Sequence, residues 1–95
     1  ICIIDDNNSQ TRSMPVHALE EKVKSFQWCT KVVDGHSVEN IAKALSEELS
    51  APLCLICQTT KGKGISEMET NTFAWHHGPP NKEQYDRFVK EVENA

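Results

Sequence analysis

Three short runs of strand-forming residues, each followed at once by polar residues, divide the chain. They cover residues 1–4, 28–33 and 53–58, and they are rich in isoleucine, valine, leucine and other residues that favour strands. The first and third runs show no alternation of polar and apolar positions, which is typical of strands buried on both faces of a parallel sheet. We therefore expect a first strand that ends at Asp5 and is buried on both faces.

Apolar residues at helical spacing fill the segments between these runs and after the last one. Val16, Leu19, Val23 and Phe26 predict an amphipathic helix that has Pro15 in its first turn. A second helix begins after Ser37, a natural N-cap, and continues to about residue 50. A capping box, Asn-Lys-Glu-Gln over residues 81–84, predicts the final helix.

The predicted order is strand, helix, strand, helix, strand, long loop, helix. Right-handed crossovers then give an α/β fold in three layers, with a parallel sheet flanked by helices on both faces. Residues 65–80 show no clear period, so they form either a functional loop or a disordered one. We expect one domain over residues 1–95 and no second domain.

Composition and charge exclude several classes of function. The chain has 95 residues and a formal net charge of -4, without a stripe of lysine and arginine, which argues against nucleic-acid or anionic membrane surfaces as partners. No apolar run approaches the roughly 20 residues that span a bilayer, so we expect a soluble, cytoplasmic protein. The chain begins inside a strand without methionine, and we expect a piece of a longer chain or of a split enzyme.

Four cysteines raise the question of a metal site or a disulfide. Cys54 and Cys57 have zinc-site spacing, and two histidines follow downstream. However, residues three apart on a strand point to opposite faces, and no turn residue lies between these two. We therefore expect buried, unreactive thiols.

Polar residues follow each predicted strand, at 5–9, 34–36 and 59–64, and parallel strands bring their ends to one edge. The first group, Asp-Asp-Asn-Asn-Ser, carries oxygen donors that suit magnesium or calcium, although such residues also form ordinary turns. The third group contains Lys-Gly-Lys-Gly over residues 61–64, which suits an anion or forms a flexible basic turn. His76 and His77 are adjacent, so only one of them is expected to enter a given site.

An ordered set of short motifs carries a resemblance that covers essentially the whole chain. The motifs are Asp-Asp-Asn-Asn at 5–8, Phe-Gln-Trp at 26–28, Val-Val-Asp-Gly-His-Ser-Val-Glu at 32–39, Thr-Thr-Lys-Gly-Lys-Gly-Ile at 59–65 and Ala-Trp-His at 74–76. This set resembles the carboxyl part of the diphosphate-binding domain of transketolases, a partial thiamine-diphosphate-binding fold. It most resembles the amino-terminal subunit of split, two-gene transketolases.

The resemblance implies thiamine diphosphate held through Mg²⁺ or Ca²⁺, and transfer of a two-carbon ketol unit between sugar phosphates. By position in the family motifs, Asn7 and the main-chain carbonyl of Ser9 are implied as metal ligands. Lys61 is implied close to the cofactor. His76 is implied at its diphosphate, with His77 as the alternative if the motif shifts by one residue.

The resemblance is incomplete in ways that matter for activity. The Gly-Asp-Gly segment that supplies the family's other metal ligand is absent, as is the glutamate of the pyrimidine-binding domain. We therefore expect no certain catalytic residue in this chain, no activity of the chain alone, and a pyrimidine-binding subunit or domain as partner in a homodimer or heterotetramer. The alternatives are a related thiamine enzyme, such as deoxyxylulose phosphate synthase or dihydroxyacetone synthase, and a non-catalytic α/β association domain.

Overall fold

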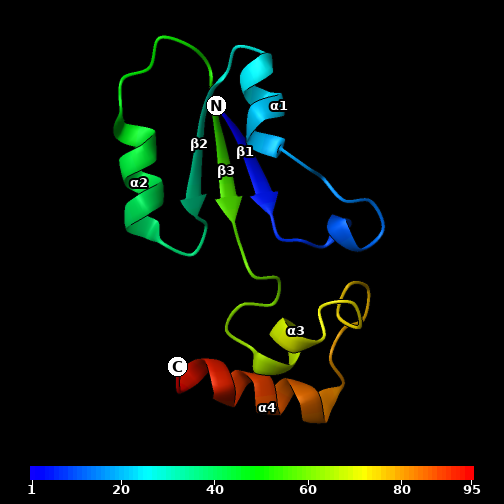
Figure 1. Cartoon of the computed structure of the whole chain (residues 1–95). Helices are drawn as coiled ribbons and strands as arrows, with labels where there is room; N and C mark the ends of the chain where they lie inside the picture. The colour runs from blue at the N-terminus through cyan, green and yellow to red at the C-terminus, as the bar shows by residue number, and fades with distance from the viewer. The chain divides into compact units, whose positions relative to one another are not determined.

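The computed structural model describes residues 1–95, except for the side chain of Arg12. The chain divides into two compact units, Ile1–Thr59 and Thr60–Ala95 (Figure 1). The helices and strands, in chain order, are β1 (Cys2–Asp6), the 3-10 helix η1 (Gln10–Arg12), α1 (Leu19–Ser25), β2 (Cys29–Asp34), α2 (Val38–Ser46), β3 (Leu53–Gln58), α3 (Ser66–Thr70) and α4 (Lys82–Glu93).

The first unit contains a three-stranded parallel sheet, with the strands in the order β1-β3-β2 (Figure 1). The connection from β1 passes over β3 to reach β2, and the next connection returns to β3. Because right-handed crossovers that run in opposite directions place their helices on opposite faces, the sheet lies between α1 and α2. The predicted α/β fold with a parallel sheet and flanking helices is confirmed.

The central strand, β3, forms most of the buried core. Every residue from Leu53 to Cys57 is buried, and Leu55 is fully inaccessible to solvent. On one face of the strand, Leu55 and Cys57 pack with Ala44 of α2, and Val33 and Ile41 cover this cluster. The prediction that the third apolar run is buried on both faces is therefore confirmed.

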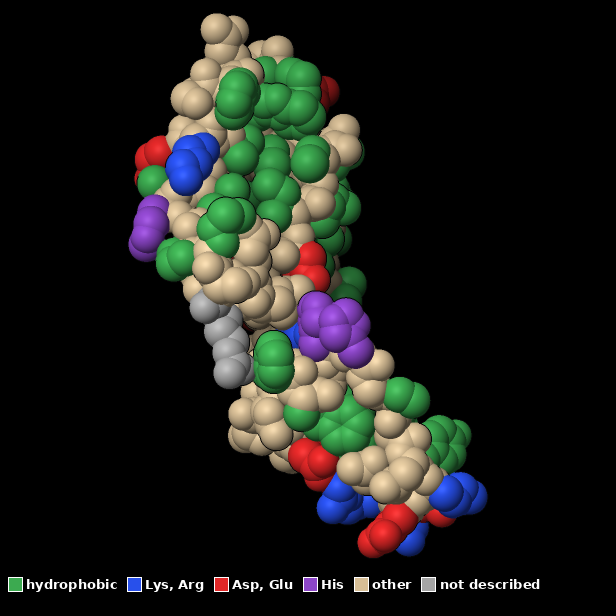
Figure 2. Space-filling view, turned by 90° about the vertical axis from the view of Figure 1, so that its right-hand side faces the viewer, with side chains coloured by type: hydrophobic (Ala, Val, Ile, Leu, Met, Phe, Trp, Pro, Cys, Tyr) green, Lys and Arg blue, Asp and Glu red, His purple; other side chains and the backbone are tan. Residues whose placement is uncertain are grey.

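The same prediction is wrong for the first strand. β1 lies at an edge of the sheet, and Ile3 on this strand is 61% exposed. An unbroken apolar run indicates that a strand can be buried on two faces, but it does not indicate whether the strand lies at the centre or at an edge of the sheet. Apolar side chains accordingly gather on a face of the first unit (Figure 2).

Both helices of the first unit are shorter than their apolar spacing predicts. α1 begins at Leu19 rather than near Pro15, because Ala18 adopts a left-handed conformation with φ of 51° and interrupts the helix. α2 ends at Ser46, because Glu47 is extended. The Ser37 cap is confirmed, and its hydroxyl accepts a hydrogen bond from the Asn40 backbone N–H at 3.2 Å.

The second unit consists of α3 and α4 with the loops around them. The predicted capping box is confirmed, since the side chains of Asn81 and Gln84 each accept a hydrogen bond from the other residue's backbone N–H at 2.9 Å. The segment 65–80 is not a structureless loop, because it contains α3. Ser66 donates from its backbone N–H to the Glu91 carboxylate at 2.8 Å, and this bond ties α3 to α4.

The cysteines follow the interpretation of buried thiols in part. All four are free; Cys54 and Cys57 are buried, whereas Cys2 and Cys29 are half-buried. Burial raises the pKa of the Cys54 and Cys57 thiols above their ordinary value, which disfavours the thiolate that metal binding and nucleophilic attack require. Within the described part of the chain, no helix is long and apolar enough to cross a bilayer.

Leu55→Ala should destabilise the first unit more than any surface truncation. The side chain is fully buried, so its removal leaves a cavity and should lower the free energy of unfolding by about 2–5 kcal/mol. Leu45→Ala is the matched control, because Leu45 is 40% exposed. Urea unfolding followed by circular dichroism measures both, and an equal loss in the two variants would contradict a core centred on β3.

Candidate functional site

The three strands of the first unit end at one edge of the sheet. Asp6 of β1, Gln58 of β3 and Asp34 of β2 are partners in the parallel register. The polar residues that follow β1 and β2, and Thr59 after β3, therefore begin at neighbouring positions. Within this unit, the predicted sharing of one edge by the strand ends is confirmed.

The loop after β1 is organised by the side chain of Asn7. Its Oδ1 accepts a hydrogen bond from the Ser9 backbone N–H at 2.9 Å, and its Nδ2 donates to Asp5 Oδ2 at the same distance. Asn8, between them, has a φ of 59°, a left-handed conformation that asparagine tolerates. A cavity of about 230 Å³ borders this loop and is lined by Ile4, Asp5, Asp6, Asn7, Asn8, Gln10, Thr11, Val16 and Leu19.

Thr59 connects the ends of all three strands. Its hydroxyl donates to Asp5 Oδ1, and its backbone N–H donates to the Asp6 carbonyl at 3.2 Å. Its methyl carbon lies where a Cβ on Gly35 would approach to 2.4 Å. Gly35 in turn donates from its N–H to the Gln58 carbonyl at 2.8 Å, so the turn after β2 lies directly against the end of β3.

The second unit brings together two of the predicted site residues. Lys61 Nζ lies 2.5 Å from His76 Nδ1. Because a lysine ammonium only donates, the ring nitrogen accepts, and a neutral imidazole then carries its hydrogen on Nε2. Both residues can thus donate to an anion. The ring of His77 lies edge-on to that of His76 with centroids 4.4 Å apart.

Packing in the second unit fixes the segments that carry this pair. Trp75 packs edge-on against the buried ring of Phe88 in α4, with ring centroids 5.3 Å apart. In the lysine loop, Gly62 has a φ of 79°, and a Cβ there would lie 2.4 Å from the Met68 Cβ. Only glycine fits this position, which explains the first glycine of Lys-Gly-Lys-Gly.

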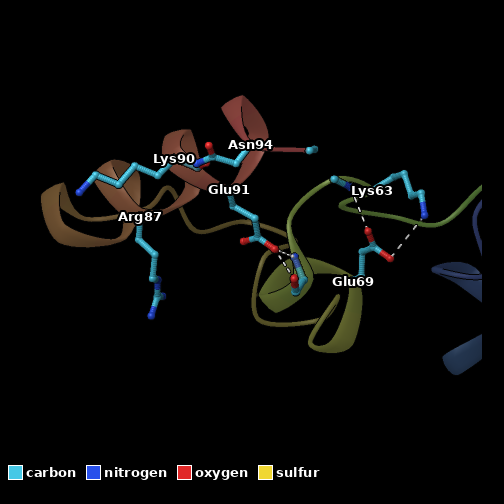
Figure 3. Close-up of a pocket in the computed structure, with 9 residues that line it drawn as sticks. Lys63, Glu69, Arg87, Lys90, Glu91 and Asn94 are labelled. Carbon is cyan, nitrogen blue, oxygen red and sulfur yellow. Dashed lines mark hydrogen bonds and ion pairs between the residues drawn. The ribbon is translucent and has the colours of Figure 1, made fainter.

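An open pocket of about 750 Å³ lies beside the lysine loop, between that loop, α3 and α4 (Figure 3). Its carboxylates contact neighbouring groups. Glu69 accepts from the Gly64 N–H at 2.9 Å and lies 3.9 Å from Lys63 Nζ, whereas Glu91 accepts from the Ser66 backbone and hydroxyl. Bonding to Ser66 lowers the pKa of the Glu91 carboxyl. The Glu69 contacts join the end of the lysine loop to α3, and the Glu91 contacts join α3 to α4.

Several known proteins are similar to this chain. Transketolase of Mus musculus is 35% identical over 77 residues, which are 81% of this chain and 12% of that protein. One subunit of the apulose-4-phosphate transketolase of Phocaeicola vulgatus is 34% identical over an alignment of 100 positions, and this match covers 97% of this chain and 35% of the length of that relative. Transketolase-like protein 2 of Mus musculus is 38% identical over an alignment of 78 positions, and this match covers 79% of this chain.

The chain belongs to the transketolase family. It spans only 12% to 35% of the length of these transketolase relatives. No protein-family model matches the chain. No solved structure matches it either.

The donor set of the first unit fits the hard cation that the transketolase resemblance implies. Asn7 Oδ1 accepts one hydrogen bond and, as a carbonyl oxygen, retains a second lone pair. Among the described residues, no three His, Cys, Asp or Glu side chains gather around a point that could hold a metal ion. A site here would therefore depend on amide and main-chain oxygens, as predicted for Asn7 and Ser9, and on ligands from elsewhere.

Sequence reasoning missed two features of this family member that the structure displays. It assigned no role to Asp5 or Thr59 individually, and it did not pair Lys61 with His76. The sequence signal for the first feature was Thr59 directly after a strand predicted to be buried, together with Gly35 in the turn after the preceding strand. The convergence of Asn7, Ser9, Lys61 and one of the two histidines on a single cofactor stays a prediction.

Gly35→Ala should destabilise the first unit and disturb the end of β3. The new Cβ would lie 2.4 Å from the Thr59 methyl carbon and 3.0 Å from both the Cys57 Cβ and the Gln58 carbonyl oxygen, and such overpacking costs about 1–3 kcal/mol. Gly78→Ala is the matched control, because the nearest atom to its Cβ would lie 3.5 Å away.

Combination with Thr59→Ser tests the cause of this loss. Serine keeps the hydroxyl and removes the methyl group, so the double variant should recover part of the unfolding free energy. Chemical denaturation of the four proteins measures the coupling, and strict additivity of the two changes would contradict a direct contact between Gly35 and Thr59.

Proposed function

We propose that this chain is part of a transketolase, a transferase that moves a two-carbon ketol unit between sugar phosphates with thiamine diphosphate and a divalent cation. The observation that carries the proposal is the similarity to proteins named transketolase or transketolase-like across 75% to 97% of the chain. The similarity to a protein named as one subunit of a transketolase supports a partner chain or domain that supplies the pyrimidine-binding part. Cytoplasmic location and assembly as a homodimer or heterotetramer belong to the same proposal.

In the first unit, we assign Asn7 and Ser9 to the metal. The loop geometry supports this assignment, because the Asn7 amide is fixed by hydrogen bonds at both ends. Mg²⁺ requires near-octahedral oxygen ligands at about 2.1 Å, and phosphate oxygens complete such a shell. Amide and main-chain carbonyl oxygens are suitable ligands for it. Ca²⁺ accepts the same donors with a larger and more flexible shell.

In the second unit, we assign Lys61 and His76 to the diphosphate. Their 2.5 Å contact supports the assignment, since the lysine directs the hydrogen of a neutral imidazole to Nε2. An ammonium and an N–H donor held together can then each donate to phosphate oxygens. His76 is preferred over His77 because His76 is the one that contacts Lys61.

The protein groups in this chain bind and orient, whereas the bond-making chemistry is the cofactor's. Bound thiamine diphosphate supplies carbanion stabilisation at its own ring. The family's Gly-Asp-Gly segment and pyrimidine-binding glutamate are absent from these 95 residues. The chain by itself is therefore proposed to be inactive, and each experiment below uses the full protein in its native assembly.

Asn7→Ala should weaken cofactor binding more than it weakens the fold. Loss of a metal ligand should raise the Kd for thiamine diphosphate in the presence of Mg²⁺ by at least about tenfold, the effect that even an outer-shell partner has on metal affinity. Asn40→Ala, at an exposed position of α2, is the control. Isothermal titration calorimetry at fixed Mg²⁺ measures both affinities.

Two results would overturn parts of this proposal. Equal affinity in Asn7→Ala and the wild type would remove the metal assignment. Failure of the wild-type protein to bind thiamine diphosphate at all would favour a non-catalytic association domain, and tight binding without transfer between sugar phosphates would favour a related thiamine enzyme.

His76→Asn should raise the Kd for thiamine diphosphate, whereas His77→Asn should leave it close to the wild-type value. The expected loss for His76→Asn is about tenfold, the size of one hydrogen bond to a charged group. The two residues are adjacent and both exposed, so each variant controls for the other's effect on stability. A larger loss in His77→Asn would transfer the role to His77.

A further inference from the structure

The carboxylate of Asp5 accepts one side-chain hydrogen bond on each of its oxygens. Asn7 Nδ2 donates to Oδ2 at 2.9 Å, and the Thr59 hydroxyl donates to Oδ1. Asp5 and Thr59 are 54 positions apart in sequence, and they join the ends of β1 and β3. Asp5 is exposed, so burial of its charge does not explain why both its oxygens are paired in this way.

The bond to Asp5 determines the orientation of the Asn7 side-chain amide, that is, the directions in which its oxygen and its NH₂ group point. With the observed orientation, Nδ2 meets an acceptor on Asp5 and Oδ1 meets the Ser9 N–H. The reversed amide would place its oxygen against a carboxylate and its NH₂ group against a backbone N–H, and both contacts would be repulsive. Only the amide oxygen coordinates a hard cation. The Asp5 carboxylate therefore selects the orientation in which that oxygen is directed away from itself.

Thr59 holds Asp5 in turn, because its own position is fixed by two further contacts. Its backbone N–H donates to the Asp6 carbonyl at 3.2 Å, and its methyl group occupies the space above Gly35. With N–H and methyl group placed by the sheet and by the β2 turn, the hydroxyl is directed to the Asp5 carboxylate.

We propose that Asp5 and Thr59 are positioning residues for the metal site, with Thr59 holding Asp5 and Asp5 holding the Asn7 amide oxygen in the orientation that binds the cation. This inference rests on the proposed function, since it assigns a role toward the same cation. It extends that function to two side chains that do not themselves touch the metal. Outer-shell hydrogen bonds of this kind orient ligands and contribute strongly to metal affinity.

The first test removes only the hydroxyl of Thr59. In the full protein in its native assembly, Thr59→Val keeps the methyl group against Gly35 and loses the hydrogen bond, whereas Thr59→Ser keeps the hydrogen bond and loses the methyl group. Mg²⁺ is titrated at fixed thiamine diphosphate, and cofactor binding is followed by calorimetry. Thr59→Val should raise the Mg²⁺ concentration for half-saturation about tenfold. Thr59→Ser should stay within about twofold of the wild type, as expected when the bond is retained.

The second test separates positioning from charge at Asp5. Asparagine can accept from the Asn7 NH₂ group and donate to the Thr59 oxygen, so Asp5→Asn retains both bonds without the negative charge. Asp5→Ala loses both. We expect half-saturation within about threefold of the wild type for Asp5→Asn and a rise of about tenfold or more for Asp5→Ala. Equal losses in the two variants would show that charge or direct ligation by Asp5 matters, and would overturn the positioning role.

The outcomes distinguish this inference from the function on which it rests. Thermal unfolding without cofactor identifies any variant that fails to fold, and the Thr59→Ser and Asp5→Asn proteins then supply the comparison. If the wild type binds no thiamine diphosphate, the proposed function fails and this inference fails with it. If the wild type binds it and Thr59→Val and Asp5→Ala both bind equally well, the positioning role fails while the proposed function stands.

Discussion

The contact between the end of β3 and its two neighbouring strands is the constraint on which the first unit depends. β3 is buried on both faces and pairs with a strand on each side, so its last residues are placed by the whole sheet. Thr59 then makes three contacts: its N–H donates to the Asp6 carbonyl, its methyl group lies above Gly35, and its hydroxyl donates to Asp5. These contacts fix the start of the loop after β1 relative to the sheet.

The absence of a side chain at Gly35 is as important to this arrangement as the presence of one at Thr59. A Cβ at this glycine would lie 2.4 Å from the threonine methyl carbon, closer than any real contact. The requirement is steric, because no positive φ is involved at this position. Because Gly35, after β2, has no side chain, Thr59 can lie against it at the end of β3. In this position the Thr59 hydroxyl reaches the Asp5 carboxylate of β1.

Local sequence pattern was sufficient for some elements and insufficient for others, for physical reasons. The central strand, the Ser37 cap and the capping box depend on residues within a few positions of one another, and the sequence predicted all three. The exposure of Ile3 depends on the strand order, which no apolar run encodes. The helical spacing of apolar residues continues to Leu49, but α2 ends at Ser46 because the backbone of Glu47 is extended.

The candidate site shows the same division. Oxygen donors after the first strand and a basic glycine loop after the third could be predicted, because their chemistry belongs to the residue types themselves. The bond between Asp5 and Thr59 and the pairing of Lys61 with His76 could not be predicted, because they join residues 54 and 15 positions apart.

The donor groups of the two units also differ in kind. The loop of Asn7 presents carbonyl oxygens, which favour a cation, whereas Lys61 and His76 present N–H donors, which favour an anion. Each set is thus chemically compatible with one part of the metal-bound diphosphate that we propose as the ligand.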